Sequence, residues 1–145
     1  MGSGGTAPQG ASWLMIVGGL GLAVLTFVTW YDVAGVQANA WDALRRSDVV
    51  IFAAGLVAAA CGAWLGFGNV GPEQRAVGLI GAGAAAVGAL IVILRMVSPP
   101  GVDTDLKIGI FLALLAALIA TIGGLIALAA KGPAVSSGAA APGDR

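Results

Sequence analysis

Residues 108–130 have the sequence IGIFLALLAALIATIGGLIALAA, an apolar run without a charged side chain. At about 1.5 Å of rise per residue, a helix of this length crosses a hydrocarbon core about 30 Å thick. Three further runs of similar length and character lie at 13–31, 49–67 and 77–97. Membrane strands need alternating polarity, whereas these runs are apolar on every side. The sequence therefore predicts an all-α membrane protein, an up-down bundle of four transmembrane helices with short loops.

The composition agrees with this class and excludes several others. Hydrophobic residues make up 59% of the 145 residues and charged residues 10%, against about 25% charged residues in soluble domains. Seven basic residues balance seven acidic ones, so the chain has no basic field for nucleic acid. With no histidine and one cysteine, Cys61, it cannot form a His/Cys metal site, a Ser-His-Asp triad or an internal disulfide. We expect no enzymatic activity, no cofactor and no nucleic-acid partner.

The apolar runs form one expected domain, residues 13–131. The flanking tails, 1–12 and 132–145, are rich in Gly, Ala, Ser and Pro, so we expect both to be disordered. An even number of spans places both termini on one side of the membrane. The Lys and Arg residues divide three against four between the two sides, and this count does not decide the orientation.

Small residues recur at helical spacing in three of the runs. Because lipid tails are as apolar as leucine, membrane helices associate through close backbone approach at small residues. These rows predict packing faces, within the bundle or between two copies, although a chain rich in Ala and Gly also produces such rows by chance. The candidate packing positions are Gly55, Ala59, Gly62, Gly66, Gly78, Gly81, Gly88, Gly109 and Gly124.

The segment between the first two runs is a candidate surface for the membrane or for a partner. Trp30 and Tyr31 have amphipathic rings that prefer the headgroup level, and we expect them to fix the end of the first helix. We also expect a short surface helix from Asn39 to Arg46, capped by Asn39. This segment serves either as an interfacial anchor or as a docking surface for a protein. Its candidate residues are Trp30, Tyr31, Trp41, Asp42, Arg45 and Arg46.

Arg95 is the one charged side chain within the four runs. A charged residue inside a span indicates an ion pair or a functional site. The nearest acidic residues along the chain are Asp103 and Asp105, and Asp32 and Asp48 are further options on the same side. Because Arg95 lies in the last turn of its run, its charge also complements the helix dipole. We expect a structural ion pair or a headgroup contact, with a transport or gating role as the alternative.

Several short segments follow one another along the chain in a set order. They are Trp30-Tyr31, Ala40-Trp41-Asp42-Ala43, Asp48, Arg95, Pro99-Pro100-Gly101, Gly109, Leu114-Leu115-Ala116-Ala117-Leu118 and Gly123-Gly124. In order and spacing they resemble a group of small four-helix membrane proteins from actinobacteria. The resemblance implies the same architecture and a place in the bacterial plasma membrane. It also implies that the Trp41 loop faces outward, with both termini in the cytoplasm, and it implies no reaction.

Three functions stay open at the level of the sequence. The leading one is a non-enzymatic accessory or scaffold subunit of a membrane assembly, in contact with a protein partner or a second copy. The second is a small transporter or channel formed by oligomerised bundles, with Arg95 at one mouth. The third is a membrane sensor of stress, pH or lipid charge that uses Asp103 and Asp105. Ion pathways normally carry carboxylates or histidines at depth, and the four runs contain none.

Overall fold

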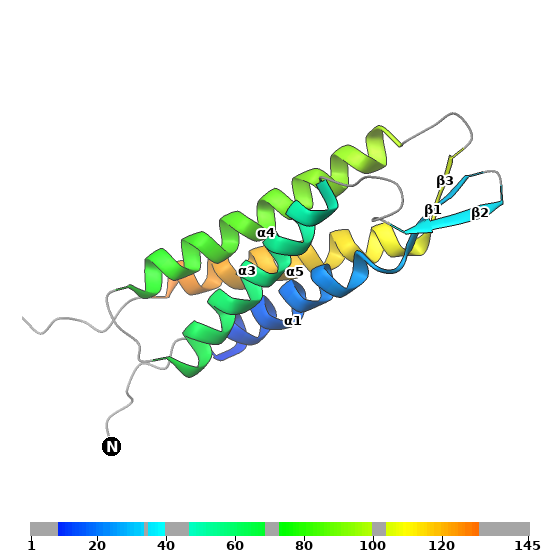
Figure 1. Cartoon of the computed structure of the whole chain (residues 1–145). Coiled ribbons are helices and arrows are strands. Elements are labelled where there is room, and N and C mark those ends of the chain that lie inside the picture. The colour runs from blue at the N-terminus through cyan, green and yellow to red at the C-terminus, as the bar shows by residue number, and fades with distance from the viewer. Residues whose placement is uncertain (1–8, 34, 40–46, 69–72, 100–103, 131–145) are drawn as a thin grey trace, which may run out of the picture.

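The computed structural model describes residues 9–33, 35–39, 47–68, 73–99 and 104–130. Within these ranges, four helices lie side by side and a small sheet lies at one end of them (Figure 1). α1 packs against α3 and α5, and α4 packs against the same two helices. The predicted, mostly helical fold is confirmed. The helices are α1 (Gln9–Leu25), α3 (Ser47–Phe67), α4 (Gln74–Val97) and α5 (Ile108–Ala129).

Length separates α1 from the other three helices. α3, α4 and α5 are long and apolar enough to cross a membrane, judged by length and composition. α1 is apolar but has 17 residues, which corresponds to about 25 Å at about 1.5 Å per residue. The predicted first run, 13–31, is wrong at both ends, because α1 begins at Gln9, inside the expected N-terminal tail, and ends at Leu25.

Two side chains bind the last carbonyl groups of α1, which have no partner within the helix. The Trp30 indole Nε1–H donates a hydrogen bond of 2.6 Å to the Leu25 carbonyl oxygen. The Thr26 hydroxyl donates one of 2.6 Å to the Ala23 carbonyl oxygen. The chain then leaves the helix and continues in an extended conformation, so Trp30 belongs to a strand.

The described residues also form a three-stranded antiparallel sheet, which was not expected from the sequence. Its strands are β1 (Thr29–Val33), β2 (Val36–Asn39) and β3 (Thr104–Leu106), in the order β2-β1-β3. Gly35, between β1 and β2, has a φ of 84°, which side-chain-bearing residues rarely adopt. Its N–H donates a 2.9 Å hydrogen bond to Asp32 Oδ1, which tightens the hairpin.

The strand β2 also changes the interpretation of the expected surface helix. Asn39, its predicted cap, is the last residue of β2 and pairs with Thr29 of β1. The rest of that predicted helix, residues 40–46, lies outside the described residues, and so do Trp41, Asp42, Arg45 and Arg46.

Small residues form the contacts between the helices. A Cβ atom added to Gly19 of α1 would lie 2.6 Å from the Gly55 carbonyl oxygen of α3, and one added to Gly124 of α5 would lie 2.6 Å from the Ala82 Cβ of α4. The nine candidate packing positions all lie at such contacts between elements of the same chain. They are Gly55, Ala59, Gly62, Gly66, Gly78, Gly81, Gly88, Gly109 and Gly124.

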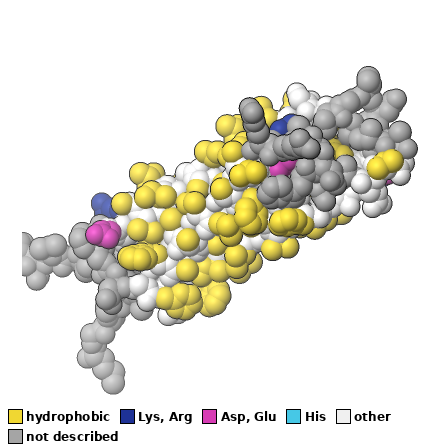
Figure 2. Space-filling model, viewed as in Figure 1, with side chains coloured by type: hydrophobic (Ala, Val, Ile, Leu, Met, Phe, Trp, Pro, Cys, Tyr) yellow, Lys and Arg dark blue, Asp and Glu magenta, His cyan; other side chains and the backbone are white. Residues whose placement is uncertain are grey.

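Large apolar side chains cover the outside of the bundle. Trp13, Phe67, Leu79 and Val97 are between 56% and 77% exposed, and similar residues occur on every helix. Figure 2 shows these side chains along the length of the bundle, with charged side chains toward its two ends. Alanine and glycine dominate the contacts between the helices, with a few large buried side chains such as Met15, Leu22 and Ile110 among them, whereas the exterior carries most of the larger apolar residues.

Candidate functional site

Three ionisable side chains from three elements come together at the sheet end of the bundle. They are Tyr31 of β1, Asp48 of the first turn of α3 and Arg95 of the last turn of α4. The Arg95 charge acts on both the Tyr31 hydroxyl and the Asp48 carboxylate, and the Asp48 charge acts on Tyr31. We call this group the polar junction.

The polar junction is buried and incompletely hydrogen-bonded. Tyr31 is 0% exposed and Asp48 is 1% exposed, whereas Arg95 is half-buried. The Tyr31 hydroxyl and both Asp48 carboxylate oxygens make no hydrogen bond to any residue that the structure describes. Burial of a carboxylate is costly unless an opposite charge offsets it. Among the described residues, Arg95 is the one whose charge offsets part of the cost of burying Asp48.

The charges of the junction also suit the helix ends that carry them. Asp48 lies in the first turn of α3, where the helix dipole favours a negative charge, and Arg95 lies in the last turn of α4, where it favours a positive one. Burial raises the pKa of Tyr31 above its ordinary value of 10.0; the Arg95 charge lowers this pKa and the Asp48 charge raises it. Tyr31 therefore stays protonated at neutral pH.

The strand β1 holds the junction in place by its contacts with the start of α5. The Lys107 N–H donates a 2.9 Å hydrogen bond to the Trp30 carbonyl oxygen. Gly109 permits this close approach, because a Cβ at that position would collide with the Thr29 carbonyl oxygen. The Trp30 and Tyr31 rings meet at an interplanar angle of 60°, with their centroids 6.5 Å apart.

The expectation that Trp30 and Tyr31 lie in the first helix is wrong, whereas their placement at headgroup level stays a prediction. Trp30 is 1% exposed and Tyr31 is 0% exposed, and both belong to β1. Their rings fill the space between the sheet and the helix ends, where Leu22, Ile51 and Ile110 surround them in the same apolar cluster. Neither ring is available to a partner.

A second charge pair lies on the sheet itself. Lys107 Nζ is 3.4 Å from Asp32 Oδ2, and their side chains are 39% and 22% exposed. Asp32 lies opposite Asp105 in the ladder between β1 and β3. Lys107 therefore reduces the repulsion between two neighbouring carboxylates. At this exposure the pair contributes roughly 0–1 kcal/mol.

The pairing of Arg95 with Asp103 or Asp105 stays a prediction, and the structure adds Asp48 as an acid on which the Arg95 charge acts. Asp105 is exposed on β3 and lies opposite Asp32, and Asp103 lies outside the described residues. The described acid on which the Arg95 charge acts is Asp48, one of the further options considered from the sequence. The sequence already pointed to Asp48, because this residue stands directly before the second apolar run, 49–67, and was expected on the same side of the membrane as Arg95.

The junction contains one carboxylate, one guanidinium and one phenol, which is chemistry suited to charge neutralisation and to fixing the sheet on the bundle. Among the residues that the structure describes, no group of three His, Cys, Asp or Glu side chains could hold a metal ion.

Comparison with protein-family models, curated proteins and solved structures finds no match for this chain. The fold and the junction define a mostly helical protein with three helices of membrane-spanning length and a small sheet at one end. The resemblance to actinobacterial four-helix membrane proteins stays a prediction.

Proposed function

We propose that this is an integral membrane protein whose four helices cross the bilayer in up-down order. The observation that carries the proposal is the apolar exterior: large hydrophobic side chains are exposed on all four described helices, while glycine and alanine form most of the contacts between the helices. In water, an apolar exterior of this extent would drive association. In a bilayer, an apolar exterior is in contact with lipid tails and does not drive association, and close contacts between small residues hold the helices together.

The short helix α1 fits this proposal when the turn after it is included. Phe27 and Val28 follow α1, and their N–H groups donate hydrogen bonds to the carbonyl oxygens of Val24 and Leu25. Both side chains are apolar and exposed. The apolar surface therefore continues past Leu25, toward the thickness of a hydrocarbon core of about 30 Å.

Within the membrane, we propose a non-enzymatic role as an accessory or scaffold subunit of a larger assembly in the bacterial plasma membrane. The small-residue faces are used for contacts within the chain, so a protein partner or a second copy must contact another surface. The sheet offers one, because β2 is an edge strand and its Val36 is 70% exposed. The hydrogen bond between β1 and Lys107 gives this sheet a fixed position.

The alternatives weighed from the sequence receive less support. A channel with Arg95 as a free charge at one mouth fits poorly with the Asp48 charge beside it. A pathway through the centre of one bundle fits poorly with Ala58, Ala85 and Ala120, which are 0% exposed and packed together there. The exposed Asp105 is the described residue that a sensor of pH or lipid charge would use.

Cysteine accessibility tests the membrane topology. In a background where Cys61 is replaced by alanine, Gln37→Cys places a thiol on β2 and Arg75→Cys places one near the start of α4; both native residues are exposed. We expect a membrane-impermeant maleimide to label Gln37→Cys in intact cells and Arg75→Cys only after permeabilisation. Ile80→Cys, on the apolar exterior of α4, is the control that stays unlabelled. Labelling of both ends from one side would exclude the proposed topology.

Site-specific cross-linking tests the accessory role. A photoreactive amino acid at Val36 samples the sheet, and one at Leu79, 61% exposed on α4, samples the apolar exterior. After irradiation in the native membrane and gentle extraction, we expect Val36 to cross-link to one protein in stoichiometric amount. A monomer without partners by native mass, with cross-links to lipid alone, would exclude this role.

A further inference from the structure

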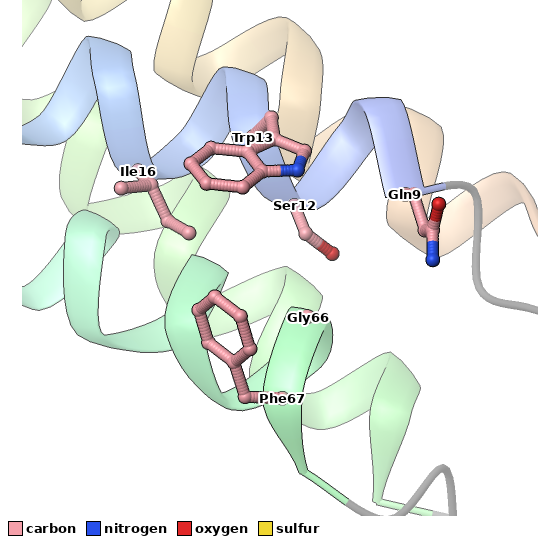
Figure 3. A pocket seen from close by; sticks show the side chains of 6 residues that line it. All are labelled: Gln9, Ser12, Trp13, Ile16, Gly66 and Phe67. Atoms are coloured by element: carbon pink, nitrogen blue, oxygen red, sulfur yellow. The ribbon is translucent and has the colours of Figure 1, made fainter.

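At the end of the bundle away from the sheet, a groove opens between the start of α1 and the end of α3 (Figure 3). It has a volume of about 210 Å³, whereas one water in the liquid occupies about 30 Å³. The groove is therefore large enough for a short length of hydrocarbon chain. The lining residues are Gln9, Ser12, Trp13, Ile16, Gly66 and Phe67.

Gly66 accounts for the space between the two helices. A Cβ at Gly66 would lie 3.2 Å from the Ser12 Cβ, so any larger side chain there would enter the groove. Trp13 and Phe67 form its outer walls, with ring centroids 6.3 Å apart and an interplanar angle of 85°. Their side chains are 56% and 77% exposed, so the groove opens on the apolar exterior of the bundle.

The lining of the groove combines polar and apolar groups. Gln9, in the first turn of α1, offers amide N–H groups, and Ser12 offers a hydroxyl; the Ser12 residue is 2% exposed. Ile16, one turn further along α1 than Ser12, and the rings of Trp13 and Phe67 supply apolar surface (Figure 3). None of the six lining residues carries a charge.

We propose that this groove binds one phospholipid of the surrounding bilayer. The Ser12 hydroxyl and the Gln9 amide donate hydrogen bonds to its ester carbonyl oxygens, and the first part of an acyl chain lies along Ile16 and Phe67. Trp13 stands at the depth of the ester groups, where tryptophan is enriched in membrane proteins. Because the lining is uncharged, the ester and acyl region is recognised and the headgroup charge is not. This inference depends on the membrane location proposed above.

Photolabelling of the wild-type protein is the first test. The protein is reconstituted in phosphatidylcholine vesicles that contain a phosphatidylcholine with a diazirine near the carboxyl end of one acyl chain, and labelled residues are mapped by mass spectrometry. We expect labelling at Ile16 and Phe67 to exceed that at Leu79 and Leu90, which are similarly apolar and exposed on α4, by about tenfold, equivalent to about 1.4 kcal/mol. Equal labelling over the whole exterior would overturn the proposal.

A matched pair of glycine variants provides the second test. Gly66→Leu fills the groove, whereas Gly83→Leu adds the same side chain to α4 where no atom lies within 4 Å of the added Cβ. In native mass spectrometry from mild detergent, we expect wild type and Gly83→Leu to retain one phosphatidylcholine and Gly66→Leu to lose about 90% of it, again a tenfold effect. Retention of the lipid by Gly66→Leu would contradict the site.

Two further measurements separate the possible causes of failure. If Gly66→Leu does not fold, Ser12→Ala replaces it, and an unchanged retention of lipid by Ser12→Ala overturns the proposed hydrogen bond. Retention of phosphatidylglycerol with loss of phosphatidylcholine would overturn the uncharged mode of recognition. If the cysteine labelling shows membrane insertion and the photolabelling is uniform, the groove proposal alone is wrong. If insertion itself fails, the proposed function is wrong as well.

Discussion

Arg95→Ala is the substitution that tests the polar junction most directly. It removes the positive charge that acts on Asp48, a residue that is 1% exposed and whose carboxylate makes no hydrogen bond to a described residue. Arg95 acts on Asp48 as a nearby charge and not through a hydrogen bond, so its removal should cost less than the about 3–5 kcal/mol that is typical of a broken buried ion pair. We expect about 2 kcal/mol.

The reverse substitution, Asp48→Asn, is expected to cost less. It leaves Arg95 without the neighbouring carboxylate, but a half-buried guanidinium on a long side chain still reaches water. Asp48 gives up no hydrogen bond to a described residue, and the neutral amide removes a buried charge, so we expect a change in stability within about 1 kcal/mol of zero. Arg95→Ala leaves the buried Asp48 behind, whereas Asp48→Asn leaves the half-buried Arg95 behind. This difference in burial sets the order of the two costs.

Equilibrium unfolding in mixed micelles measures both costs, with helix content followed by far-ultraviolet circular dichroism as the denaturing detergent increases. The double variant Arg95→Ala/Asp48→Asn is expected to be more stable than Arg95→Ala alone, because no uncompensated charge stays buried. Lowering the pH from about 8 to about 5 should also restore part of the stability of Arg95→Ala, since a protonated Asp48 carries no charge. Strictly additive costs, or an Arg95→Ala cost within about 0.5 kcal/mol of zero, would refute the junction.

Four further predictions follow from the contacts of single residues. Gly19→Ala places a Cβ 2.6 Å from the Gly55 carbonyl oxygen and should cost about 1–3 kcal/mol in the same unfolding assay, with Gly83→Ala near neutral as its control. Trp30→Phe removes the 2.6 Å hydrogen bond to the Leu25 carbonyl oxygen and should cost about 1 kcal/mol; an unchanged stability would show that the indole N–H contributes nothing. Asp32→Asn keeps an acceptor for the Gly35 N–H but removes the charge pair with Lys107, so its cost should stay below about 1 kcal/mol and vanish in high salt. Because burial raises the pKa of Tyr31 above 10.0 in the folded state, the unfolded chain loses this proton first as the pH rises; stability should fall above pH 10 in the wild type and fall less in Tyr31→Phe.

Three of the four helices could be predicted from the sequence. The runs at 49–67, 77–97 and 108–130 correspond to α3 (Ser47–Phe67), α4 (Gln74–Val97) and α5 (Ile108–Ala129). Each run is bounded by charged, proline or glycine residues that interrupt its apolar pattern. An apolar run of this length is too long for a strand, so length decided the structure here.

The prediction of one helix over 13–31 failed because hydrophobicity alone does not distinguish a helix from a buried strand. The segment from Thr29 to Val33 continues the apolar run, yet Thr, Trp, Tyr and Val are residues that favour strands. Val33 and Val36 flank Ala34-Gly35, a two-residue connection that includes glycine, which is typical of a hairpin. Residue type and turn spacing would have distinguished β1 from α1. The length of the apolar run alone assigned both to one helix.

One of the three residues of the polar junction, Arg95, could be identified from the sequence as a candidate ion-pair or gating residue. A lone charge in an apolar run identifies Arg95 from the sequence alone. Its partner Asp48 lies 47 positions earlier in the chain, and only the packing of α3 against α4 brings the two together. Proximity in sequence favoured Asp103 and Asp105 instead, although the ladder between β1 and β3 places Asp105 opposite Asp32. The third member, Tyr31, depended on a strand that the sequence analysis assigned to a helix.

The packing of the bundle limits where function can lie. Contacts such as those of Gly19 with Gly55 and of Gly124 with Ala82 bring helix backbones so close that a single added methyl group has no space. Packed interiors respond to such changes by strain and do not deform smoothly. A mechanism that slides these helices past one another would have to break several contacts at once. Partner and lipid contacts are therefore best sought at the two ends, at the sheet with its exposed Val36 on one side and at the Trp13–Phe67 groove on the other.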